Sequence, residues 1–560
     1  MHAAGRDVLD AIDKESVPRL ERAGFRRAGT AMAIPLPTHS NIAESTVGRH
    51  ARGRLADRLA LLYEAPDRRT RNFTFRELDE VSSRLASALA RRGVQRGQPV
   101  AIHTGQRPET LIVHLAAYKT GAVAMTLSQL YGPDTLAHAF RDSGARMLFT
   151  ERHAWAAVSH LLGSLAQSID CIYLDDDGPD GYERLVREPV GEFQPEMTRG
   201  DDPALLMYTS GSTGLPKGLL HGHRVLDAYM PTVRLFYNLE TEREGLRFWT
   251  PADWAWVGGL LDLVLPALVE GHPVIAAPHR FEAEHSFDLM ARHEITHSFM
   301  TPTALKRLAE LAEPQSRWPL KLATVCTGGE SLPSEVVRWC ERAMRATCNE
   351  FYGLTEFNHL VGNCKAIYPI RPGSMGRAYP GHRTTIVDDA GRELPPGETG
   401  EIVAHVSDPT LFLGYWNERG LPDRLRLGDW LRTSDLAYRD ADGYFWYQGR
   451  NDDLIKSAGY RIGPAEVEDC LVAHKAVAEA AVVGVPDRER GAIVKAFIRL
   501  SPGYAAGDAL ARELQEHVKS RLAAYKYPRQ VEFVSEFPLT SSGKIRRGEL
   551  RRREAEKAAT

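Results

Sequence analysis

The stretch from Ala204 to Gly218 constrains the fold of this chain more than any other. An apolar run leads directly into a segment of small and hydroxyl residues, Ala204-Leu-Leu-Met-Tyr-Thr209 followed by Ser210-Gly-Ser-Thr-Gly-Leu-Pro-Lys-Gly218. The run predicts a buried strand, and the segment predicts a loop whose backbone N–H groups and hydroxyls face an anion, with one lysine beside it. We therefore expect a sheet that presents a phosphate-handling loop, and a glycine-rich linker is the alternative interpretation.

A P-loop phosphotransferase is the first enzyme class to consider for such a loop. The Walker A motif requires Ser or Thr directly after its lysine, because that hydroxyl binds the magnesium ion. Here Gly218 follows Lys217. The loop lacks the Walker magnesium ligand, which disfavours this class.

Length and composition exclude several other classes. A chain of 560 residues exceeds what one hydrophobic core accommodates, so we expect at least two domains. Hydrophobic residues make up 43% and charged residues 26%, which argues against disorder. The formal net charge of -3 provides no basic surface for nucleic acid. The six cysteines form no CxxC pairs, so neither a zinc site nor a disulfide framework is indicated.

The sequence also predicts no membrane contact. The first residues mix acidic and basic side chains and lack the apolar core of a secretory signal. The most apolar stretch, Val257 to Val269, is interrupted by Asp262 and Pro266 and is too short to cross a bilayer. We expect a cytoplasmic protein with no membrane partner.

Strands and helices alternate through the first two thirds of the chain. A capping box at Thr74 to Glu77 begins a helix that ends at Gly93. A strand at Pro99 to Ile102, a helix at Pro108 to Tyr118 and a strand at Gly121 to Met125 follow. The same pattern recurs with strands at Arg146 to Phe149, Cys171 to Leu174, Pro273 to Ala276 and Leu322 to Val325. Such strands, apolar on both faces, indicate an α/β fold with parallel sheets covered by helices.

The pattern changes twice in the last third. After Pro380, short strands separated by Gly and Pro turns indicate a small β-barrel-like subdomain. The polar run Gly449 to Asp453 indicates a domain boundary, which divides the chain into residues 1–449 and 450–560. Beyond it we expect a small, mobile α+β domain. Its elements are a helix at Pro464 to Ala473, strands at Ala480 to Val485 and Val494 to Leu500, a helix at Ala509 to Ala524 and a strand at Val531 to Phe537.

Five motifs together resemble the core motifs of the adenylate-forming enzymes, in the same order. They are Tyr208 to Gly218, Tyr352-Gly-Leu-Thr-Glu356, Thr433-Ser-Asp435, Gly449-Arg-Asn-Asp-Asp453 and Pro538-Leu-Thr-Ser-Ser-Gly-Lys544. That family includes acyl-CoA synthetases, luciferases and the adenylation domains of peptide synthetases. The resemblance implies an enzyme that activates a carboxylate with ATP, releasing pyrophosphate from an acyl-adenylate, and uses Mg²⁺.

The resemblance implies roles for individual residues. Glu356 is the expected magnesium ligand, since a hard cation prefers carboxylate oxygens, and Thr355 is expected at the α-phosphate. Lys217 adds a positive charge beside the phosphates. Asp435 is expected to accept hydrogen bonds from the ribose hydroxyls. The remaining residues implied to bind ATP or AMP are Thr209, Ser210, Gly211, Ser212, Thr213, Gly214, Gly329, Glu330, Ser331, Tyr352 and Arg450.

The C-terminal domain carries a second set of implied roles. Lys544 is the expected catalytic cation of adenylation, and its motif matches a pattern associated in this family with lysine acetylation, which implies an acetyltransferase partner. Asp452 matches the hinge about which the small domain rotates. After rotation, coenzyme A is expected to contact Gly459, Tyr460 and Arg461.

Two glycines bear on the acid. Within the family, Asn41 to Glu44 and Thr250 to Gly259 are most similar to the acetyl-CoA and medium-chain acyl-CoA synthetase branch. Gly353 stands where acetyl-CoA synthetases have tryptophan, and Gly258 where they usually have threonine. We therefore expect a deeper acyl pocket, also lined by Trp254, Trp256 and Val257, although core packing is an alternative for the tryptophans.

The predicted function is an AMP-forming acyl-CoA synthetase for a medium-chain, branched or cyclic carboxylic acid rather than acetate, with coenzyme A as acceptor. Two alternatives remain at this point. One is an aryl-acid or other carboxylate ligase that loads a carrier-protein thiol. The other is a non-catalytic regulatory homologue that binds ATP, which the presence of all four key residues disfavours: Lys217, Glu356, Asp435 and Lys544.

Overall fold

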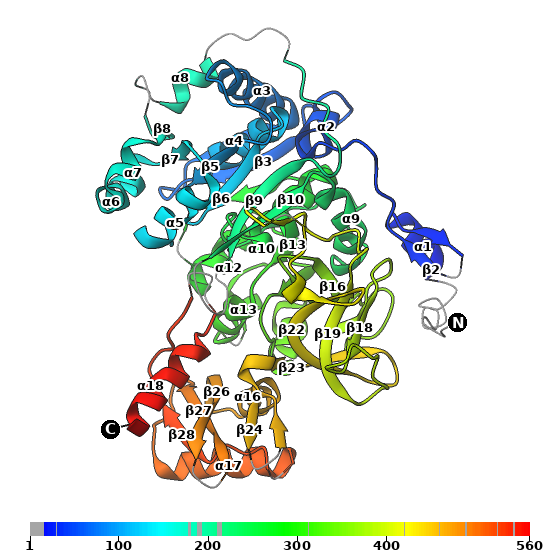
Figure 1. Ribbon diagram of the computed structural model, residues 1–560, viewed down its shortest axis with the longest axis vertical. Helices are drawn as coiled ribbons and strands as arrows, with labels where there is room; N and C mark the ends of the chain where they lie inside the picture. Colours follow the sequence, from blue (N-terminus) through cyan, green and yellow to red (C-terminus); the bar gives the residue numbers. More distant parts are fainter. Residues whose placement is uncertain are drawn as a thin grey trace.

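The computed structural model describes most of the chain. The described residues are 16–29, 31–176, 178, 181–187, 193–209, 216–279, 281–311, 313–418, 420–457, 460–487, 490–523, 525–540 and 544–559. They form a large N-terminal unit and a smaller C-terminal unit, the latter coloured orange to red in Figure 1. Within these ranges, no helix combines the length and apolar character that a membrane span requires.

The strand that precedes the glycine-rich segment lies inside a seven-stranded sheet. In spatial order its strands are β20 (Gly414–Tyr415), β10 (Lys217–Gly222), β9 (Pro203–Thr209), β6 (Val123–Leu127), β5 (Pro99–His103), β7 (Met147–Thr150) and β8 (Asp170–Tyr173). The pairs from β9 to β8 are parallel, and β10 pairs antiparallel with both β9 and β20. The parallel core agrees with the predicted alternation of strands and helices.

A larger sheet joins parallel and antiparallel regions. Its described strands in order are β18 (Thr384–Val387), β19 (Thr399–His405), β22 (Trp430–Arg439), β23 (Tyr444–Arg450), β17 (Gly376–Ala378), β16 (Asn358–Gly362), β15 (Thr347–Leu354), β14 (Thr324–Gly328), β13 (His297–Phe299), β11 (Phe248–Trp249), β12 (Val274–Ala276), β3 (Leu59–Glu64) and β4 (Thr70–Thr74), with β21 (Arg426–Leu427) beside β22. The strands predicted as a barrel-like subdomain therefore form an antiparallel region continuous with the parallel strands.

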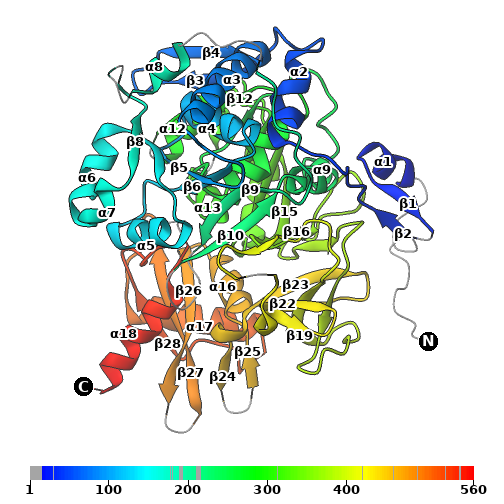
Figure 2. The same cartoon turned by 45° about the horizontal axis from the view of Figure 1, so that its top comes forward.

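Helices lie between and around these sheets (Figures 1 and 2). Those of the N-terminal unit are α1 (Val17–Arg22), α2 (Arg49–Ala51), α3 (Phe75–Arg91), α4 (Pro108–Lys119), α5 (Pro133–Ser143), α6 (Arg152–Leu162), α7 (Ser164–Gln167), α8 (Tyr182–Arg187), α9 (Arg224–Phe236), α10 (Val257–Gly259), α11 (Leu265–Val269), α12 (Ala283–Arg292), α13 (Pro302–Ala309), α14 (Pro314–Arg317) and α15 (Ser334–Trp339). A small hairpin, β1 (Arg26–Ala28) and β2 (Ala31–Ala33), follows α1 and projects from the large unit.

The predicted capping box begins α3. The Thr74 side chain accepts a hydrogen bond from the Glu77 N–H, and the Glu77 carboxylate accepts one from the Thr74 N–H. Gly93, just beyond the helix, has a positive φ of 82°. Both ends of α3 thus follow from local sequence, because each satisfies backbone groups that the helix leaves unpaired.

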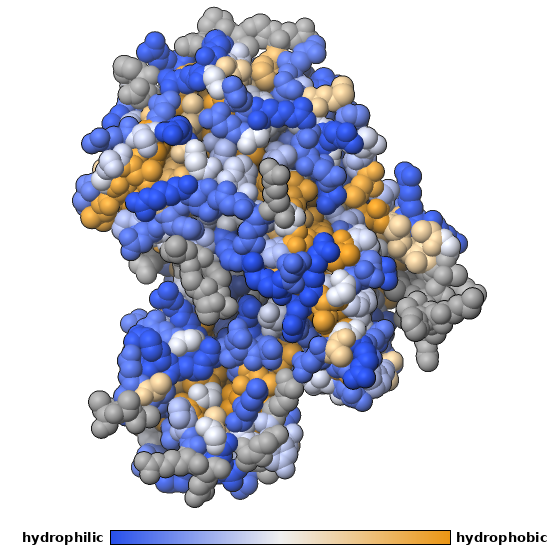
Figure 3. Space-filling model, in the orientation of Figure 1, coloured by the Kyte–Doolittle hydropathy of each residue, from blue (hydrophilic) through white to orange (hydrophobic). Residues whose placement is uncertain are grey.

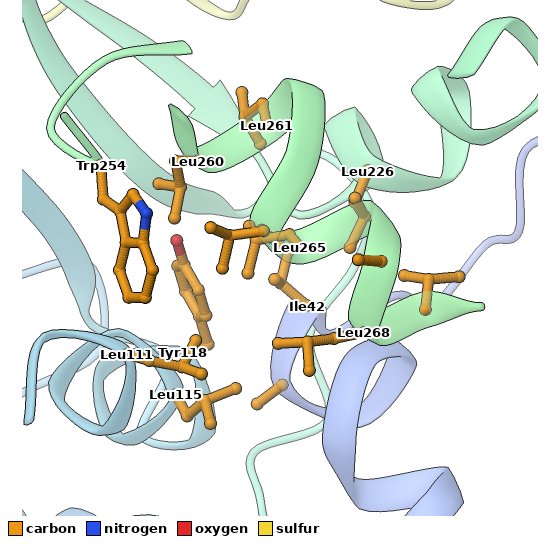
Figure 4. Packing of buried hydrophobic residues seen from close by; sticks show 14 of the residues in the cluster. Ile42, Leu111, Leu115, Tyr118, Leu226, Trp254, Leu260, Leu261, Leu265 and Leu268 are labelled. Atoms are coloured by element: carbon orange, nitrogen blue, oxygen red, sulfur yellow. The ribbon is translucent and has the colours of Figure 1, made fainter. Parts of the chain in front are cut away.

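The most apolar stretch of the chain lies in the core, where its residues from Leu260 to Val269 are buried. Trp254 is only 1% exposed and packs with Tyr118 and Leu260 (Figure 4). All twelve residues of α4 are buried, which explains why this helix has no polar face. Residues Leu260–Val264 form a π-helical turn that continues into α11.

The C-terminal unit is an α+β structure, as predicted. Its elements are the hairpin β24 (Ile455–Ser457) and β25 (Tyr460–Ile462), the sheet β26 (Val477–Asp487), β27 (Gly491–Leu500) and β28 (Gln530–Phe533), and the helices α16 (Pro464–Val472), α17 (Asp508–Arg521) and α18 (Arg547–Ala559). The last strand ends four residues earlier than expected, at Phe533, since the polar and proline residues that follow do not extend its pairing with β27.

Specific contacts fix the two units against each other. The Ser334 N–H donates a 2.8 Å hydrogen bond to the Asp469 carboxylate, and Arg499 forms a 2.9 Å ion pair with Glu310. A cavity of about 580 Å³ lies between the units, lined on one side by Glu350 and Ser331. The indentation between them is visible in Figure 3.

Candidate active site

The predicted phosphate loop connects two neighbouring strands. Thr209 at the end of β9 pairs directly with Lys217 at the start of β10. Ser210, Gly211, Ser212, Thr213 and Gly214 lie outside the described residues, so their predicted role remains a prediction. The hairpin brings Thr209 and Lys217 to one edge of the site.

The Lys217 side chain lies near two side chains that come much later in the sequence, Tyr415 and Glu418. Its Nζ lies 4.9 Å from the ring centroid of Tyr415 and 3.7 Å from Glu418 Oε1. The side chain is 44% exposed, so the ion pair with Glu418 is weak. An incoming phosphate can therefore compete for this ammonium.

Thr355 and Glu356 occupy the turn between β15 and β16. Glu356 is partly buried, and its Oε1 accepts a 3.1 Å hydrogen bond from Tyr415 Oη. Burial raises the pKa of Glu356, whereas the Tyr415 hydrogen bond and the Arg450 charge oppose that shift. Thr355 and Glu356 lie in the turn of a β-hairpin, because β15 and β16 pair antiparallel on either side of them.

A buried histidine supports the same turn. His221 on β10 is 1% exposed and forms a hydrogen bond with the Thr355 backbone. Burial lowers the pKa of His221 to about 4, so the ring is neutral at physiological pH. The neutral ring supports the turn through this contact.

The predicted ribose residue is held by two tyrosines. Asp435 is 4% exposed and accepts hydrogen bonds from Tyr352 Oη at 2.8 Å and Tyr447 Oη at 3.2 Å. Burial raises the pKa of Asp435, and the charge of Arg450, its cross-strand neighbour on β23, counteracts the shift. Ser434, the residue before Asp435, has a positive φ of 63°, which is a strained conformation for a residue other than glycine.

Gly329, Glu330 and Ser331, which are predicted to bind ATP or AMP, follow β14. Gly329 has a φ of 90°, which favours glycine at this position. Glu330 accepts a 2.7 Å hydrogen bond from the Thr303 hydroxyl, and Ser331 is partly exposed beside it. The positive φ of Gly329 therefore turns the chain sharply at the end of β14.

Lys544 reaches this turn from the other end of the chain. A Cβ built on Gly329 would lie 3.9 Å from Lys544 Nζ, and the Lys544 charge acts on the Asp435 carboxylate. The Lys544 N–H donates to Thr540 Oγ1, and the Thr540 N–H donates back to the Lys544 carbonyl. The structure thus brings Lys544 close to Gly329, and the Lys544 charge acts to lower the pKa of Asp435.

The predicted acyl-pocket residues lie in two environments. Trp254 belongs to the buried core, whereas Trp256 is half-buried and packs edge-on against Tyr131 at 5.5 Å. Val257 and Gly258 follow in α10. A Cβ on Gly258 would lie 2.4 Å from Phe299, so the ring of Phe299 occupies the space that a side chain would need.

The backbone around Gly353 leaves no room for a side chain at this position. Gly353 lies at an irregularity in the β15–β16 ladder, and a Cβ there would lie 1.6 Å from the Asn358 carbonyl oxygen. Any side chain at this position requires the hairpin to change shape. The expectation that Gly353 deepens the pocket remains a prediction.

The hinge and coenzyme A residues are only partly described. Asp452 is exposed on a short 3-10 turn after β23. Tyr460 is 50% exposed and stacks on Tyr525, with ring centroids 4.1 Å apart. Gly459 lies outside the described residues, and Arg461 is described only as part of β25.

Two family profiles match this chain. The profile of the AMP-binding enzyme matches residues 48–416, and that of the AMP-binding enzyme C-terminal domain matches residues 466–544. The chain belongs to the AMP-binding enzyme family. The resemblance inferred from the five motifs is confirmed, as are the expected fold class and the expectation of an acid-thiol ligase.

Individual relatives of this AMP-binding enzyme cover nearly its full length. An uncharacterized acyl-CoA ligase of Bacillus subtilis (strain 168) is 35% identical over 505 residues, covering 88% of this chain and 93% of the relative. The acetyl-coenzyme A synthetase of the same organism is 34% identical over 532 residues, covering 91% and 90%. The crystal structure of the anthranilate CoA ligase AuaEII in complex with anthranoyl-AMP has a TM-score of 0.84 at 29% identity, covering 94% of this chain and 99% of that chain.

The oxygen donors of this AMP-binding enzyme suit Mg²⁺ when ATP is present. Glu356 supplies one partly buried carboxylate. Within the described ranges, no group of three or more His, Cys, Asp or Glu side chains is arranged to hold a metal ion. Mg²⁺ typically binds one or two carboxylates and completes its shell with water and substrate phosphates, which agrees with this arrangement.

Sequence reasoning missed two side chains that organise the site: Tyr415 and Tyr447. Each acts through a contact between segments far apart in the chain. Neither tyrosine offered a sequence signal that distinguishes it from a core residue.

Proposed function

We propose that this protein is an AMP-forming acyl-CoA synthetase that activates a medium-chain, branched or cyclic acid rather than acetate. The observation that carries the proposal is the position of Lys544 beside Gly329 and within electrostatic reach of Asp435. This places a cation from the C-terminal unit at the residues that resemble the nucleotide site. The family match supports the same reaction class.

The reaction has two steps. A carboxylate oxygen forms a bond to the α-phosphorus of ATP, and the bond to pyrophosphate breaks, which yields an acyl-adenylate. The thiolate of coenzyme A then bonds to the acyl carbon and AMP leaves. Mg²⁺ bound at Glu356 would neutralise phosphate charge during the first step.

Four side chains have proposed roles in the first step. Lys544 stabilises the negative charge that develops on the α-phosphate, since a preorganised cation acts most strongly in a partly dry site. Thr355 contacts the α-phosphate, and Lys217 moves from Tyr415 to the leaving pyrophosphate. Asp435 accepts from the ribose hydroxyls in addition to its two tyrosine donors. The other proposed ATP or AMP contacts are Thr209, Ser210, Gly211, Ser212, Thr213, Gly214, Gly329, Glu330, Ser331, Tyr352 and Arg450.

We propose that the second step requires rotation of residues 450–560 against residues 1–449, with Asp452 as the hinge. Coenzyme A would then contact Gly459, Tyr460 and Arg461. The Asp452→Pro variant tests the hinge: it should retain pyrophosphate release and lose thioester formation, because proline restricts φ at the hinge. Equal loss of both steps would contradict a hinge at this residue.

The proposed acid follows from the pocket residues. Trp254, Trp256, Val257, Gly258 and Gly353 are the proposed lining, and neither glycine has a side chain that would shorten the pocket. Phe299 occupies the space beside Gly258, so its ring position also sets the depth. Each methylene buried in such a pocket contributes about 0.8 kcal/mol, which favours acids longer than acetate.

A second candidate acid is aromatic. Similarity to an anthranilate CoA ligase favours it, and Phe299 and Trp256 would suit a flat ring. A carrier-protein thiol is the alternative acceptor. A purely regulatory ATP-binding role is disfavoured because Lys217, Glu356, Asp435 and Lys544 are all present.

The deciding experiment is a panel of carboxylic acids assayed for pyrophosphate release with and without coenzyme A. The proposal predicts the highest specificity constant for a medium-chain, branched or cyclic aliphatic acid, with acyl-CoA as product. Acetate or an aryl acid as the best substrate would contradict the proposed acid. Pyrophosphate release without acyl-CoA would contradict coenzyme A as acceptor.

We also propose that Lys544 is a target for a lysine acetyltransferase, because its side chain is exposed and its motif matches the acetylation pattern. Acetylation would remove the charge that adenylation uses. Incubation with an acetyltransferase and acetyl-CoA, followed by intact-mass and activity measurements, should show modification with loss of pyrophosphate release. A chain that stays unmodified at Lys544 would contradict this role.

A further inference from the structure

Strand β20 lies at the edge of the seven-stranded sheet and touches two parts of the site. The backbone N–H of Trp416 donates a 2.8 Å hydrogen bond to the Gly218 carbonyl, next to Lys217. The N–H of Phe412 donates a 2.9 Å bond to the Glu356 carbonyl. The backbone around β20 is therefore tied both to the strand that carries Lys217 and to the turn that carries Glu356.

The side chain of Tyr415 completes the same connection. Its Oη donates to Glu356 Oε1 at 3.1 Å, and its ring centroid lies 4.9 Å from Lys217 Nζ. One side chain thus contacts both the Glu356 carboxylate and the Lys217 ammonium. Neither of the two charged groups has an ion pair with the other among the described contacts, so the tyrosine is the link between them.

We propose that Tyr415 is a positioning residue for adenylation, holding the Glu356 carboxylate through its hydroxyl and the Lys217 ammonium through its ring. This inference rests on the proposed function, because adenylation is the step in which both groups act on the triphosphate. A phenol hydroxyl is a neutral donor, so it orients the carboxylate and leaves its negative charge for a cation.

The ring contact suits a lysine that must move. A cation over an aromatic face at a partly exposed site is held more weakly than a charge held by phosphate oxygens. Tyr415 therefore keeps Lys217 near the entrance of the site and releases it when the phosphates arrive. The nearby carboxylate of Glu418 adds a second weak contact in the same place.

The test separates the two functions of the side chain. Tyr415→Phe removes only the hydroxyl, and Tyr415→Leu removes the ring as well. Tyr379→Phe is the control, since it removes the hydroxyl of a buried tyrosine that donates to the Asn363 carbonyl at 2.9 Å, away from the site. ATP binding to the full chain is measured by calorimetry over a series of MgCl₂ concentrations, without any acid.

For Tyr415→Phe we expect the Mg²⁺ concentration that supports half-maximal ATP binding to rise about tenfold, the effect of losing one hydrogen bond to a charged group. Tyr379→Phe should match the wild type. In a double-mutant cycle, Lys217→Ala should weaken ATP binding several-fold less in the Tyr415→Leu background than in the wild type, because the lysine is already misplaced.

A Tyr415→Phe protein with wild-type Mg²⁺ dependence would overturn the proposed hydroxyl contact. Additive effects of Tyr415→Leu and Lys217→Ala would overturn the proposed ring contact. If Tyr415→Leu does not fold, Tyr415→Met takes its place in the cycle with Lys217→Ala, because it also removes the ring. Failure of the proposed function is distinguishable, because the wild type itself would then release no pyrophosphate with any acid in the panel.

Discussion

Lys544 Nζ lies 3.9 Å from the position that a Cβ on Gly329 would occupy. Strand β14 ends immediately before Gly329, and Lys544 follows the last strand of the C-terminal unit. Lys544 of the C-terminal unit is therefore close to residues of the N-terminal unit that are proposed to bind the nucleotide. In this arrangement Lys544 is proposed to act in adenylation.

Replacing this lysine should affect one half-reaction. Lys544→Ala is expected to reduce pyrophosphate release at least a hundredfold, the loss typical for removal of one preorganised charge from a transition state. Thioester formation from a synthetic acyl-adenylate and coenzyme A should stay near the wild-type rate. Lys519→Ala, which removes an exposed lysine of α17, is the matched control. Equal loss of both half-reactions would contradict the assignment.

Replacing the buried aspartate should change nucleotide selectivity. Wild-type enzyme should prefer ATP to 2′-deoxyATP, because Asp435 is proposed to accept from the ribose hydroxyls. In Asp435→Ala this preference should fall about tenfold, the effect of losing a hydrogen bond to a charged acceptor. Ratios of kcat/KM for the two nucleotides provide the measurement, and an unchanged ratio would rule out the ribose role.

Gly353→Ala and Phe299→Ala should have different effects. Gly353→Ala places a Cβ 1.6 Å from a backbone oxygen, so it should destabilise the protein by about 2 kcal/mol or more whatever the acid. Phe299→Ala should instead move the preferred acid toward longer chains, since it clears the space beside Gly258. Thermal unfolding and a chain-length series measure the two effects. A stable Gly353→Ala protein with altered acid preference would show that Gly353 faces an open pocket.

Features that depend on neighbouring residues could be predicted from the sequence, and features that depend on distant residues could not. The capping box of α3 and the parallel strands were predictable because their signals are local. The sequence showed that Gly353 lacks a side chain where related enzymes have tryptophan. It could not show that the Asn358 carbonyl leaves no room for a Cβ, because that contact depends on an irregularity in the β15–β16 pairing. No feature of the sequence indicated a role for Tyr415, because its contacts with Glu356 and Lys217 form only in the folded chain.

Stability should fall as pH falls below about 6.5. Burial lowers the pKa values of several described histidines, most strongly those of His103, His221 and His223, to about 4, and that of His114, to about 3. Between these values and 6.5 the unfolded chain binds protons that the folded chain does not. The stabilisation is therefore complete above 6.5 and is lost as pH falls toward 4, by about 1.4 kcal/mol per pH unit for each group.

Thermal midpoints measured from pH 7 to pH 5 check this expectation. His103→Gln should reduce the slope of stability against pH, because one proton-excluding group is lost. His153→Gln, at an exposed position of α6, is the control and should leave the slope unchanged. A midpoint that stays constant over this range would contradict the buried neutral histidines.

The fate of an isotopic label tests the central claim most directly. The enzyme is incubated with ATP, Mg²⁺, coenzyme A and the preferred acid carrying ¹⁸O in both carboxylate oxygens, and the AMP formed is analysed by mass spectrometry. Attack of the carboxylate on the α-phosphorus predicts one ¹⁸O atom in each AMP and one in each acyl-CoA. AMP without the label would contradict an acyl-adenylate and with it the proposed roles of Lys544 and Glu356.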